Sequence, residues 1–279
     1  MIIDFHTHTF PDRIAEKAIA GIQQKCRSAA FTDGTANGLT RSMEEAGIDR
    51  CVVLPVATNP EKLESMNRAA IEQNGKNGRI CFGAMHPLAE NWKAQLDGLK
   101  AAGIQGIKLH PVYQGVDITD GRYLRILERC GELELIVVTH AGDEIAYPGI
   151  VRCSPEMIAA VLRQVGPVKL VLAHMGGWRN WDRVVDCLGP TGVFVDTALS
   201  LGRIEPVGNE NREEAELLLL EQENFCRMVE QLGSERVLFG TDSPWGQQKR
   251  DLDAIRALRL SAGQKGQILG ANARALLKI

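Results

Sequence analysis

The sequence has 279 residues, of which 44% are hydrophobic and 24% charged, so it has ample apolar material for a core and no bias toward disorder. Its length is close to the about 250 residues of one (β/α)8 barrel. The formal net charge of −3 provides no basic surface for nucleic acid and no polybasic signal for a membrane, so we expect neither partner.

Two further features predict a cytoplasmic protein. No charged and apolar leader precedes the first strand, and no apolar run approaches the about 20 residues that cross a bilayer. The seven cysteines are scattered singly, without a Cys-x-x-Cys pair. Such spacing is typical of reduced thiols that serve as small core residues.

The first stretch, residues 1–10, runs from apolar residues into two histidines that lie two positions apart. In an extended strand this spacing directs the side chains of His6 and His8 to the same face. Imidazole is the commonest metal ligand in proteins, so the pair is typical of half a metal site. A half-buried strand with two hydrogen-bonded histidines is the alternative.

The rest of the chain alternates between helical and extended patterns. Apolar residues four positions apart predict a helix over residues 12–26, a loop over 27–39 follows, and a helix over 40–46 ends at Gly47. Further helices are predicted over residues 61–73, 91–101, 121–130 and 154–165. Short apolar runs predict strands over residues 50–56, 79–85, 106–109, 133–139, 168–173, 192–195 and 236–240.

Eight apolar strands that alternate with helices indicate βαβ units and a parallel sheet. Right-handed crossovers can close eight such units into a barrel. We therefore predict an α/β fold, a single-domain (β/α)8 TIM barrel over residues 1–279. A doubly wound open sheet is disfavoured because no Gly-x-Gly-x-x-Gly turn follows the first strand.

Two segments are longer than the connections expected in such a repeat, and both are predicted on the active-site face. One is the loop over residues 27–39, and the other is a helical insertion over residues 199–231. The insertion contains an acid-rich stretch, residues 210–223, with four consecutive leucines. A solvated helix whose leucines pack on the barrel is favoured over a mobile substrate lid.

Histidines occur only where predicted strands end, and their positions are 6, 8, 86, 110, 140 and 174. In a barrel the carboxyl ends of the strands converge on one mouth. Asp242 also follows a predicted strand, which adds an oxygen ligand to the nitrogen ligands. This mixture suits zinc or another divalent transition metal.

Five motifs occur in a fixed order: Asp-Phe-His-Thr-His, Gly-Ile-Lys-Leu-His-Pro, Val-Val-Thr-His-Ala-Gly, Leu-Ala-His-Met-Gly-Gly and Leu-Phe-Gly-Thr-Asp-Ser-Pro-Trp. Together they resemble the amidohydrolase superfamily. More narrowly, they resemble its amidohydrolase-related branch, which also contains the aminocarboxymuconate-semialdehyde-type decarboxylases. The resemblance extends over the whole chain.

The resemblance implies that His6, His8, His140 and Asp242 hold one divalent metal ion, most simply Zn²⁺, with Mn²⁺ as an alternative. It implies a catalytic role for His174, although a role in bracing the barrel mouth stays open. A cation at this site lowers the pKa of a bound water toward about 7. Asp242 or His174 would take the proton when the water attacks a carbonyl carbon.

Four residues are candidates for substrate binding: Lys108, His110, Tyr113 and Trp178. Lys108 lies two positions before His110 and so faces the same way in a strand. It can serve as a cation for a substrate carboxylate or form a salt bridge within the barrel. The resemblance adds a third alternative, because a carboxylated strand-four lysine bridges two metal ions in binuclear members of the superfamily.

The sequence thus favours a metal-dependent hydrolase that cuts an amide, lactone or ester bond of a small, carboxylated molecule. The alternative is a metal-dependent, non-oxidative decarboxylase of an unsaturated or aromatic acid. A barrel that only binds a ligand is disfavoured, because binding does not require four converging metal ligands. A small-molecule substrate is the expected partner, and a homodimer is left open.

Overall fold

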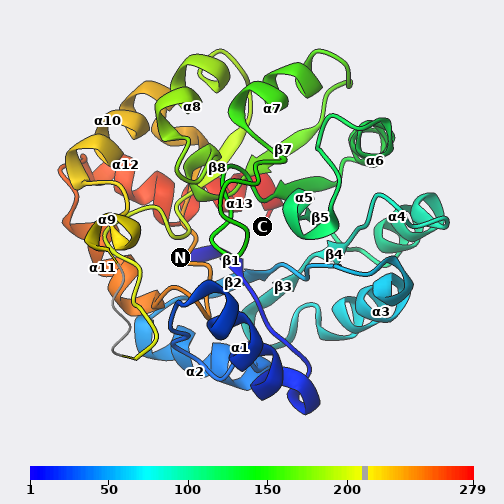
Figure 1. The fold of residues 1–279 in the computed structure, drawn as a ribbon, viewed down its shortest axis with the longest axis horizontal. Helices are drawn as coiled ribbons and strands as arrows, with labels where there is room; N and C mark the ends of the chain where they lie inside the picture. The colour runs from blue at the N-terminus through cyan, green and yellow to red at the C-terminus, as the bar shows by residue number, and fades with distance from the viewer. Residues whose placement is uncertain (209–212) are drawn as a thin grey trace. The chain divides into compact units, whose positions relative to one another are not determined.

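The computed structural model describes residues 1–208 and 213–279. These residues form two compact units. The first unit consists of Met1–Val52 and Asp196–Ile279, and the second unit consists of Val53–Val195. Strands and helices follow one another along the chain in each unit (Figure 1).

The strands lie where the short apolar runs predict them. They are β1 (Ile3–Thr7), β2 (Arg50–Val53), β3 (Arg79–Cys81), β4 (Gly83–Ala84), β5 (Gly106–Leu109), β6 (Ile136–Thr139), β7 (Lys169–Leu172), β8 (Phe194–Asp196) and β9 (Val237–Leu238). The predicted third strand is divided at Phe82 into β3 and β4. The eight predicted strands are otherwise confirmed, with shorter bounds at several ends.

The helices fill the segments between the strands. The α-helices are α1 (Asp12–Cys26), α2 (Ala36–Ala46), α3 (Leu63–Gln73), α4 (Trp92–Ala101), α5 (Pro111–Gln114), α6 (Gly121–Glu132), α7 (Pro155–Leu162), α8 (Trp181–Leu188), α9 (Glu214–Leu217), α10 (Gln222–Leu232), α11 (Gln248–Ala257), α12 (Ala262–Gly266) and α13 (Asn272–Leu277). Short 3-10 or π segments are η1 (Pro60–Lys62), η2 (Lys76–Gly78), η3 (His174–Gly176), η4 (Ser234–Arg236) and η5 (Gln267–Ala271).

In the second unit, β4 to β7 form a parallel sheet in chain order, and the first residues of β8 extend it. Leu109 is in register with Thr139, and Thr139 is in register with Leu172. The carboxyl ends of β5, β6 and β7 are therefore level. As a result, His110 and His140 leave the sheet side by side at one edge.

Helices α3, α4 and α6 follow one another along β4 to β6 in the second unit (Figure 1). The apolar stripe of α6 illustrates why: Tyr123, Ile126, Leu127 and Cys130 are buried and recur at helical spacing. Helix α7 starts as predicted, because the Ser154 side chain accepts a hydrogen bond from the backbone N–H of Met157.

The first unit is built around β1, all of whose residues are buried. The backbone N–H of Phe5 donates to the carbonyl of Phe239 over 2.7 Å, which places β1 beside the end of β9. On its other side β1 neighbours β2. Segment η5 packs on β1 and β9, and a Cβ atom on Gly270 would lie only 2.2 Å from the carbonyl oxygen of Met1. Glycine is needed there because backbone approaches backbone.

The predicted loop over residues 27–39 is too long, because α2 begins at Ala36. The Thr35 side chain accepts a hydrogen bond from the backbone N–H of Gly38 over 2.9 Å, which caps the helix. Asp33 in turn accepts the backbone N–H and the hydroxyl of Thr35. The Ala-Asn-Gly composition indicates a loop, but the cap overrides this weak helix propensity.

Replacing the cap, Thr35→Ala, is expected to lower the free energy of unfolding by about 1 kcal/mol. The physical reason is the loss of the acceptor for the orphan N–H of Gly38. Urea denaturation measures the change. Thr40→Ala on the same helix is the matched control, because its hydroxyl donates to the Ala36 carbonyl and caps nothing. Equal losses in both variants would contradict the assignment of the cap.

The predicted helix over residues 210–223 is wrong after Leu217, where α9 ends. Residues 209–212 of the insertion lie outside the described residues. Helix α9 ends at Leu217, and Leu218 and Leu220 pair with Arg203 and Leu201 in extended backbone. Leu217 and Leu219 are 3% and 8% exposed, whereas Leu218 is 49% exposed. The leucines alternate with a period of two, so the predicted packing holds for Leu217 and Leu219 only.

The two long segments of the first unit pair with each other. The backbone N–H of Ala29 donates to the carbonyl of Glu205 over 2.8 Å, and Ser28 pairs with Pro206. The backbone N–H of Phe31 donates to the carbonyl of Pro244 over 2.7 Å. The loop after β1 is therefore held against the segment after β8 and the segment after β9. A substrate lid in the insertion over residues 199–231 stays the disfavoured alternative.

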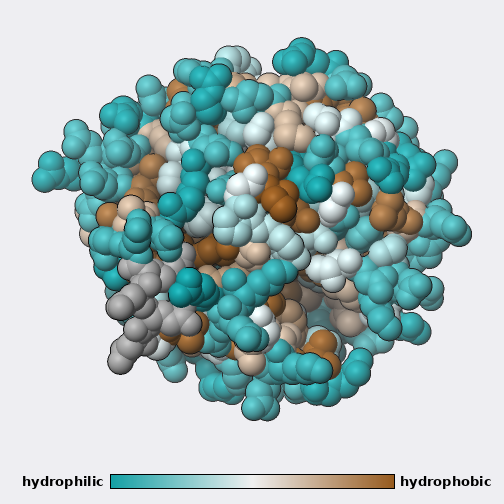
Figure 2. All heavy atoms as spheres, viewed as in Figure 1, coloured by the Kyte–Doolittle hydropathy of each residue, from teal (hydrophilic) through white to brown (hydrophobic). Residues whose placement is uncertain are grey.

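On the face drawn in Figure 2, hydrophilic residues cover most of the surface, and hydrophobic residues form several separate patches. Among the described helices, none combines the length and the apolarity needed to cross a membrane. All seven cysteines are free, and five of them are buried, as predicted. The cytoplasmic location, the exclusion of nucleic acid and membrane partners, and the homodimer stay predictions.

Candidate metal centre

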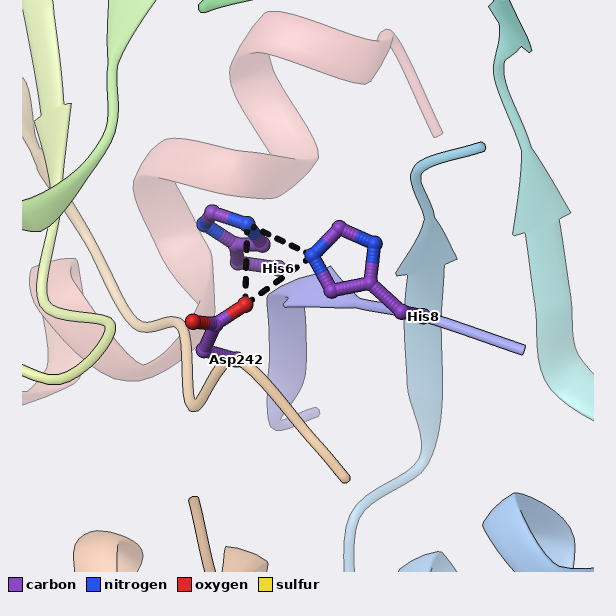
Figure 3. Close-up of side chains that lie close together, drawn as sticks. All are labelled: His6, His8 and Asp242. Atoms are coloured by element: carbon purple, nitrogen blue, oxygen red, sulfur yellow. Dashed lines mark hydrogen bonds and ion pairs between the residues drawn. The ribbon is translucent and has the colours of Figure 1, made fainter. Parts of the chain in front are cut away.

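Three predicted ligands lie together in the first unit. The Nε2 atoms of His6 and His8 are 3.2 Å apart, and Asp242 Oδ1 lies 3.3 Å from the first and 2.9 Å from the second (Figure 3). Figure 3 shows both imidazoles and the carboxylate pointing toward one another, from β1 and from the segment after β9. The prediction that His6 and His8 share a face of their strand is confirmed.

Backbone hydrogen bonds hold these elements in place. The N–H of Asp242 donates to the carbonyl of His6 over 2.8 Å, and the N–H of His8 donates to the carbonyl of Ser243 over 2.6 Å. Asp242 has a φ of +63°, in the left-handed region that non-glycine residues rarely adopt. Strained backbone of this kind is typical of functional sites, where the surrounding structure enforces it.

The spacing of the three atoms fits one cation. Nitrogen and oxygen ligands at about 2.0–2.2 Å from one ion lie about 2.8–3.6 Å apart in octahedral or tetrahedral geometry. The observed separations of 2.9, 3.2 and 3.3 Å match this range. The residues present therefore fit a divalent metal ion, and their role as its ligands stays a prediction.

The tautomer of His6 supports this fit. Its Nδ1 atom lies 2.8 Å from Asp196 Oδ2, and both side chains are buried. An ionised carboxylate only accepts hydrogen bonds, so Nδ1 is the nitrogen that donates to Asp196, and in the neutral form of the ring Nε2 carries the lone pair. The lone pair of Nε2 then faces His8 and Asp242. Asp196 is absent from the predicted site, and its only signal in the sequence is its place at the end of a predicted strand.

Asp4, also in β1, connects the elements around the site through hydrogen bonds. Its carboxyl accepts hydrogen bonds from the Thr241 hydroxyl and backbone N–H, from the Gln248 side chain and from the His6 backbone N–H. Burial raises the pKa of the Asp4 carboxyl to about 7, although these hydrogen bonds lower it. Asp4 thus joins β1, the segment after β9 and α11 behind the ligand group.

A second group of titratable side chains lies in the second unit, at the edge where β5, β6 and β7 end. His140 Nδ1 is 3.1 Å from His174 Nε2, and Glu144 Oε2 lies 3.4 Å from His110 Nε2 and 3.6 Å from His140 Nε2. All four side chains are buried. Glu144 is absent from the predicted site, because it lies in a loop with no periodic pattern.

The tautomer of His140 follows from its neighbours. Its Nε2 atom lies 2.9 Å from the carbonyl oxygen of Asp143, which only accepts, so Nε2 carries the proton. The lone pair of Nδ1 then faces His174. Burial, followed by the charge of His110, lowers the pKa of His140 well below its usual 6.5. The ring is therefore neutral, which is the form that binds metal.

His110, His140 and Glu144 are close enough together to suggest a separate cation site. The orientation of the two imidazole rings does not fit such a site. The two imidazoles are stacked at 4.3 Å with an angle of 11° between their planes, so their in-plane lone pairs run parallel and do not converge. The Nε2 proton of His140 is also directed at a carbonyl. We therefore assign this trio to hydrogen bonding within the protein.

The predicted substrate-binding residues also lie in the second unit. His110 caps α5 through Nδ1 and is stacked on the ring of Tyr113, whose hydroxyl donates to Glu144 over 3.3 Å. Lys108 is 1% exposed within β5. The backbone of Trp178 pairs with Gly142, which joins the segments after β6 and β7. A role of these residues in substrate binding stays a prediction.

His174, the predicted catalytic residue, is buried directly after β7 in η3. Its φ is +60°, and the following Met175 has a φ of +53°. The indole N–H of Trp181 donates to the carbonyl of His174 over 2.9 Å, which supports this unusual turn. Left-handed backbone thus occurs at both predicted catalytic residues, His174 and Asp242.

Comparisons with known proteins address the fold and the family. A family model described as amidohydrolase matches residues 3–279. A search of curated proteins gives no match. An uncharacterized TIM-barrel protein from Bordetella bronchiseptica is similar in structure, with a TM-score of 0.76, 17% identity, and coverage of 99% of this chain and 98% of that chain.

Two further similar structures come from enzymes. A dihydroxybenzoic acid decarboxylase from Polaromonas sp., with bound manganese and the inhibitor 2-nitroresorcinol, has a TM-score of 0.68, 15% identity and coverage of 99% and 96% of the two chains. A proposed 2-pyrone-4,6-dicarboxylic acid hydrolase from Pseudomonas putida has a TM-score of 0.62, 20% identity and coverage of 99% and 97%. The predicted fold class, a single-domain (β/α)8 TIM barrel, is confirmed. The predicted loop over residues 27–39 ends earlier, at the start of α2, and the limits of the insertion over residues 199–231 stay a prediction.

Proposed function

The chain belongs to the amidohydrolase family, and from this premise we propose that it is a metal-dependent hydrolase of an amide, lactone or ester bond in a small, carboxylated molecule. The observation that carries the proposal is the convergence of His6, His8 and Asp242, whose ligand atoms are 2.9–3.3 Å apart. Two imidazole nitrogens and a carboxylate oxygen at these distances require a cation or shared protons between them, because their lone pairs otherwise repel one another.

We propose His140 as the fourth ligand, on the basis of the family resemblance and of the lone pair that its neutral ring carries on Nδ1. A bound divalent cation would polarise a substrate carbonyl and acidify a water enough for it to react near neutral pH. A set of three imidazoles and one carboxylate suits Zn²⁺, and Mn²⁺ is the alternative because a similar structure contains it.

The residues of the chain itself would move the proton. Asp242 and His174 are the proposed acceptors of the proton that the attacking water loses, and the same proton would then pass to the leaving group. His174 is suited to this role because burial and its turn fix the ring, with Nε2 directed at His140. Lys108, which is buried in β5, is the proposed partner of a substrate carboxylate, with His110, Tyr113 and Trp178 as further contacts.

A second candidate is non-oxidative decarboxylation of an unsaturated or aromatic acid. The similarity to a dihydroxybenzoic acid decarboxylase over nearly the whole chain favours it. In this reaction the bond between a carbon atom and the carboxylate breaks, carbon dioxide leaves, and a proton is delivered to that carbon. The same proton-carrying residues would serve, so the ligand group fits both reactions.

Product analysis separates the two reactions. The protein, loaded with Zn²⁺ or Mn²⁺, is incubated with carboxylated lactones, esters and amides and with hydroxybenzoic acids, in ¹⁸O-labelled water and in D₂O. The proposal predicts that ¹⁸O enters the product of a lactone, ester or amide, and that a chelator abolishes turnover. Deuterium on carbon together with carbon dioxide release would establish the second candidate. A protein that binds neither ion and converts none of these compounds would contradict both.

A further inference from the structure

Asp196 is adjacent to the candidate metal centre: it contacts His6 but is not one of the three converging residues. It is the last residue of β8, it is fully buried at 0% exposure, and its Oδ2 atom lies 2.8 Å from His6 Nδ1. Its other oxygen, Oδ1, accepts the backbone N–H of Ala198 over 3.1 Å. The carboxylate is therefore oriented by its own backbone turn, with one oxygen left to face the imidazole.

This contact decides which nitrogen of His6 can bind a cation. Because Asp196 accepts the proton on Nδ1, the lone pair is on Nε2, the atom 3.2 Å from His8 Nε2 and 3.3 Å from Asp242 Oδ1. The distance of 2.8 Å lies in the range of charge-assisted hydrogen bonds. The ring is thereby fixed both in its tautomer and in its rotation about the Cβ–Cγ bond.

The packing around the pair leaves little room for another arrangement. A Cβ atom on Gly240 would lie 2.9 Å from the Cβ of His6 and 3.4 Å from the Cβ of Asp196. The absence of a side chain at Gly240 allows β1 and the ends of β8 and β9 to approach closely. Both side chains of the pair are at most 1% exposed, so water does not compete for this hydrogen bond.

We propose that Asp196 is a positioning residue of the metal centre: it holds His6 in the Nδ1-protonated tautomer and directs Nε2 at the cation. The inference rests on the proposed function, because it assumes that His6 is a ligand. Asp196 itself is not one of the three residues whose ligand atoms converge. Its effect passes through the imidazole, as with the carboxylates that orient metal-binding histidines in other proteins.

The test combines metal affinity with the tautomer of His6. In Asp196→Asn the side-chain amide keeps its volume but loses its charge, and its NH₂ group can donate to Nδ1, which moves the ring proton to Nε2. The affinity for Zn²⁺ or Mn²⁺, measured by competition with a chromophoric chelator, is expected to fall about 10–100-fold. In the metal-free protein, ¹⁵N NMR of labelled histidines is expected to show the Nδ1–H tautomer at His6 in the wild type and its loss in the variant.

Asp4→Asn is the matched control, because Asp4 is equally buried and contacts the backbone N–H of His6 but not its ring. This variant is expected to keep the His6 tautomer. Unchanged affinity and tautomer in Asp196→Asn, or the same loss of tautomer in both variants, would overturn the inference. A wild-type protein that binds neither cation would instead overturn the proposed function, and the NMR comparison of the metal-free proteins would still decide the role of Asp196.

Discussion

Asp242→Asn is expected to abolish both stoichiometric metal binding and turnover. The substitution removes the negative charge that balances the cation and leaves an amide whose NH₂ group can be directed at two imidazole nitrogens 2.9 and 3.3 Å away. Loss of a direct ligand should lower the metal affinity more than loss of a positioning residue does. We therefore expect the affinity to fall by about 100-fold or more. Metal content per chain, measured after dialysis, checks this.

Asp253→Asn is the control for the loss of charge. Asp253 lies in α11 of the same unit, is exposed, and pairs with Lys249 and Arg256. This variant is expected to keep full metal content and turnover. If Asp242→Asn kept a full equivalent of metal, or if the control lost it as well, Asp242 could not be assigned as a ligand.

His174→Asn is the second substitution with a large expected effect, and it is expected to separate chemistry from metal binding. Removal of a general base costs about 10²–10⁴ in rate, equivalent to about 2.7–5.5 kcal/mol of transition-state stabilisation. The kcat on the substrate identified by the product analysis should fall by this factor. The metal content should stay at the wild-type value, because His174 is proposed as a proton carrier and not as a ligand.

The pH dependence of the residual rate provides a further measurement on this variant. If His174 carries the proton, the limb of the pH–rate profile that reports the ionisation of the base should disappear in His174→Asn. A variant that loses its metal together with its activity would identify His174 as a metal ligand and contradict its role as a proton carrier alone. Unchanged kcat would leave only the structural role, in which His174 braces its turn.

Much of the fold could be predicted because the strands carry a simple signal. Parallel strands buried on both faces are continuous apolar runs, and β5, β6 and β7 lie within the predicted ranges. The same signal places His110 and His140 at strand ends, which the register of β5 and β6 confirms. The start of α2 could not be predicted, because it depends on a cap contact between Thr35 and Gly38.

The candidate site could be predicted less completely. His6, His8 and Asp242 are found because metal-binding residue types occur where strands end. Asp196 and Glu144 are missed, since a carboxylate gains its role only from the imidazole that it meets, and their partners are distant in sequence or lie across a loop. The extended backbone near Leu218 is missed because consecutive leucines fit a helix and a strand equally well.

The central claim, that one cation lies between His6, His8 and Asp242, is tested most directly by anomalous diffraction from crystals soaked in Mn²⁺. We predict one strong anomalous peak, with His6 Nε2, His8 Nε2 and an Asp242 carboxylate oxygen each about 2.0–2.2 Å from its centre. An anomalous map from saturated crystals without a peak at this position, or with the ion bound only elsewhere, would contradict the claim.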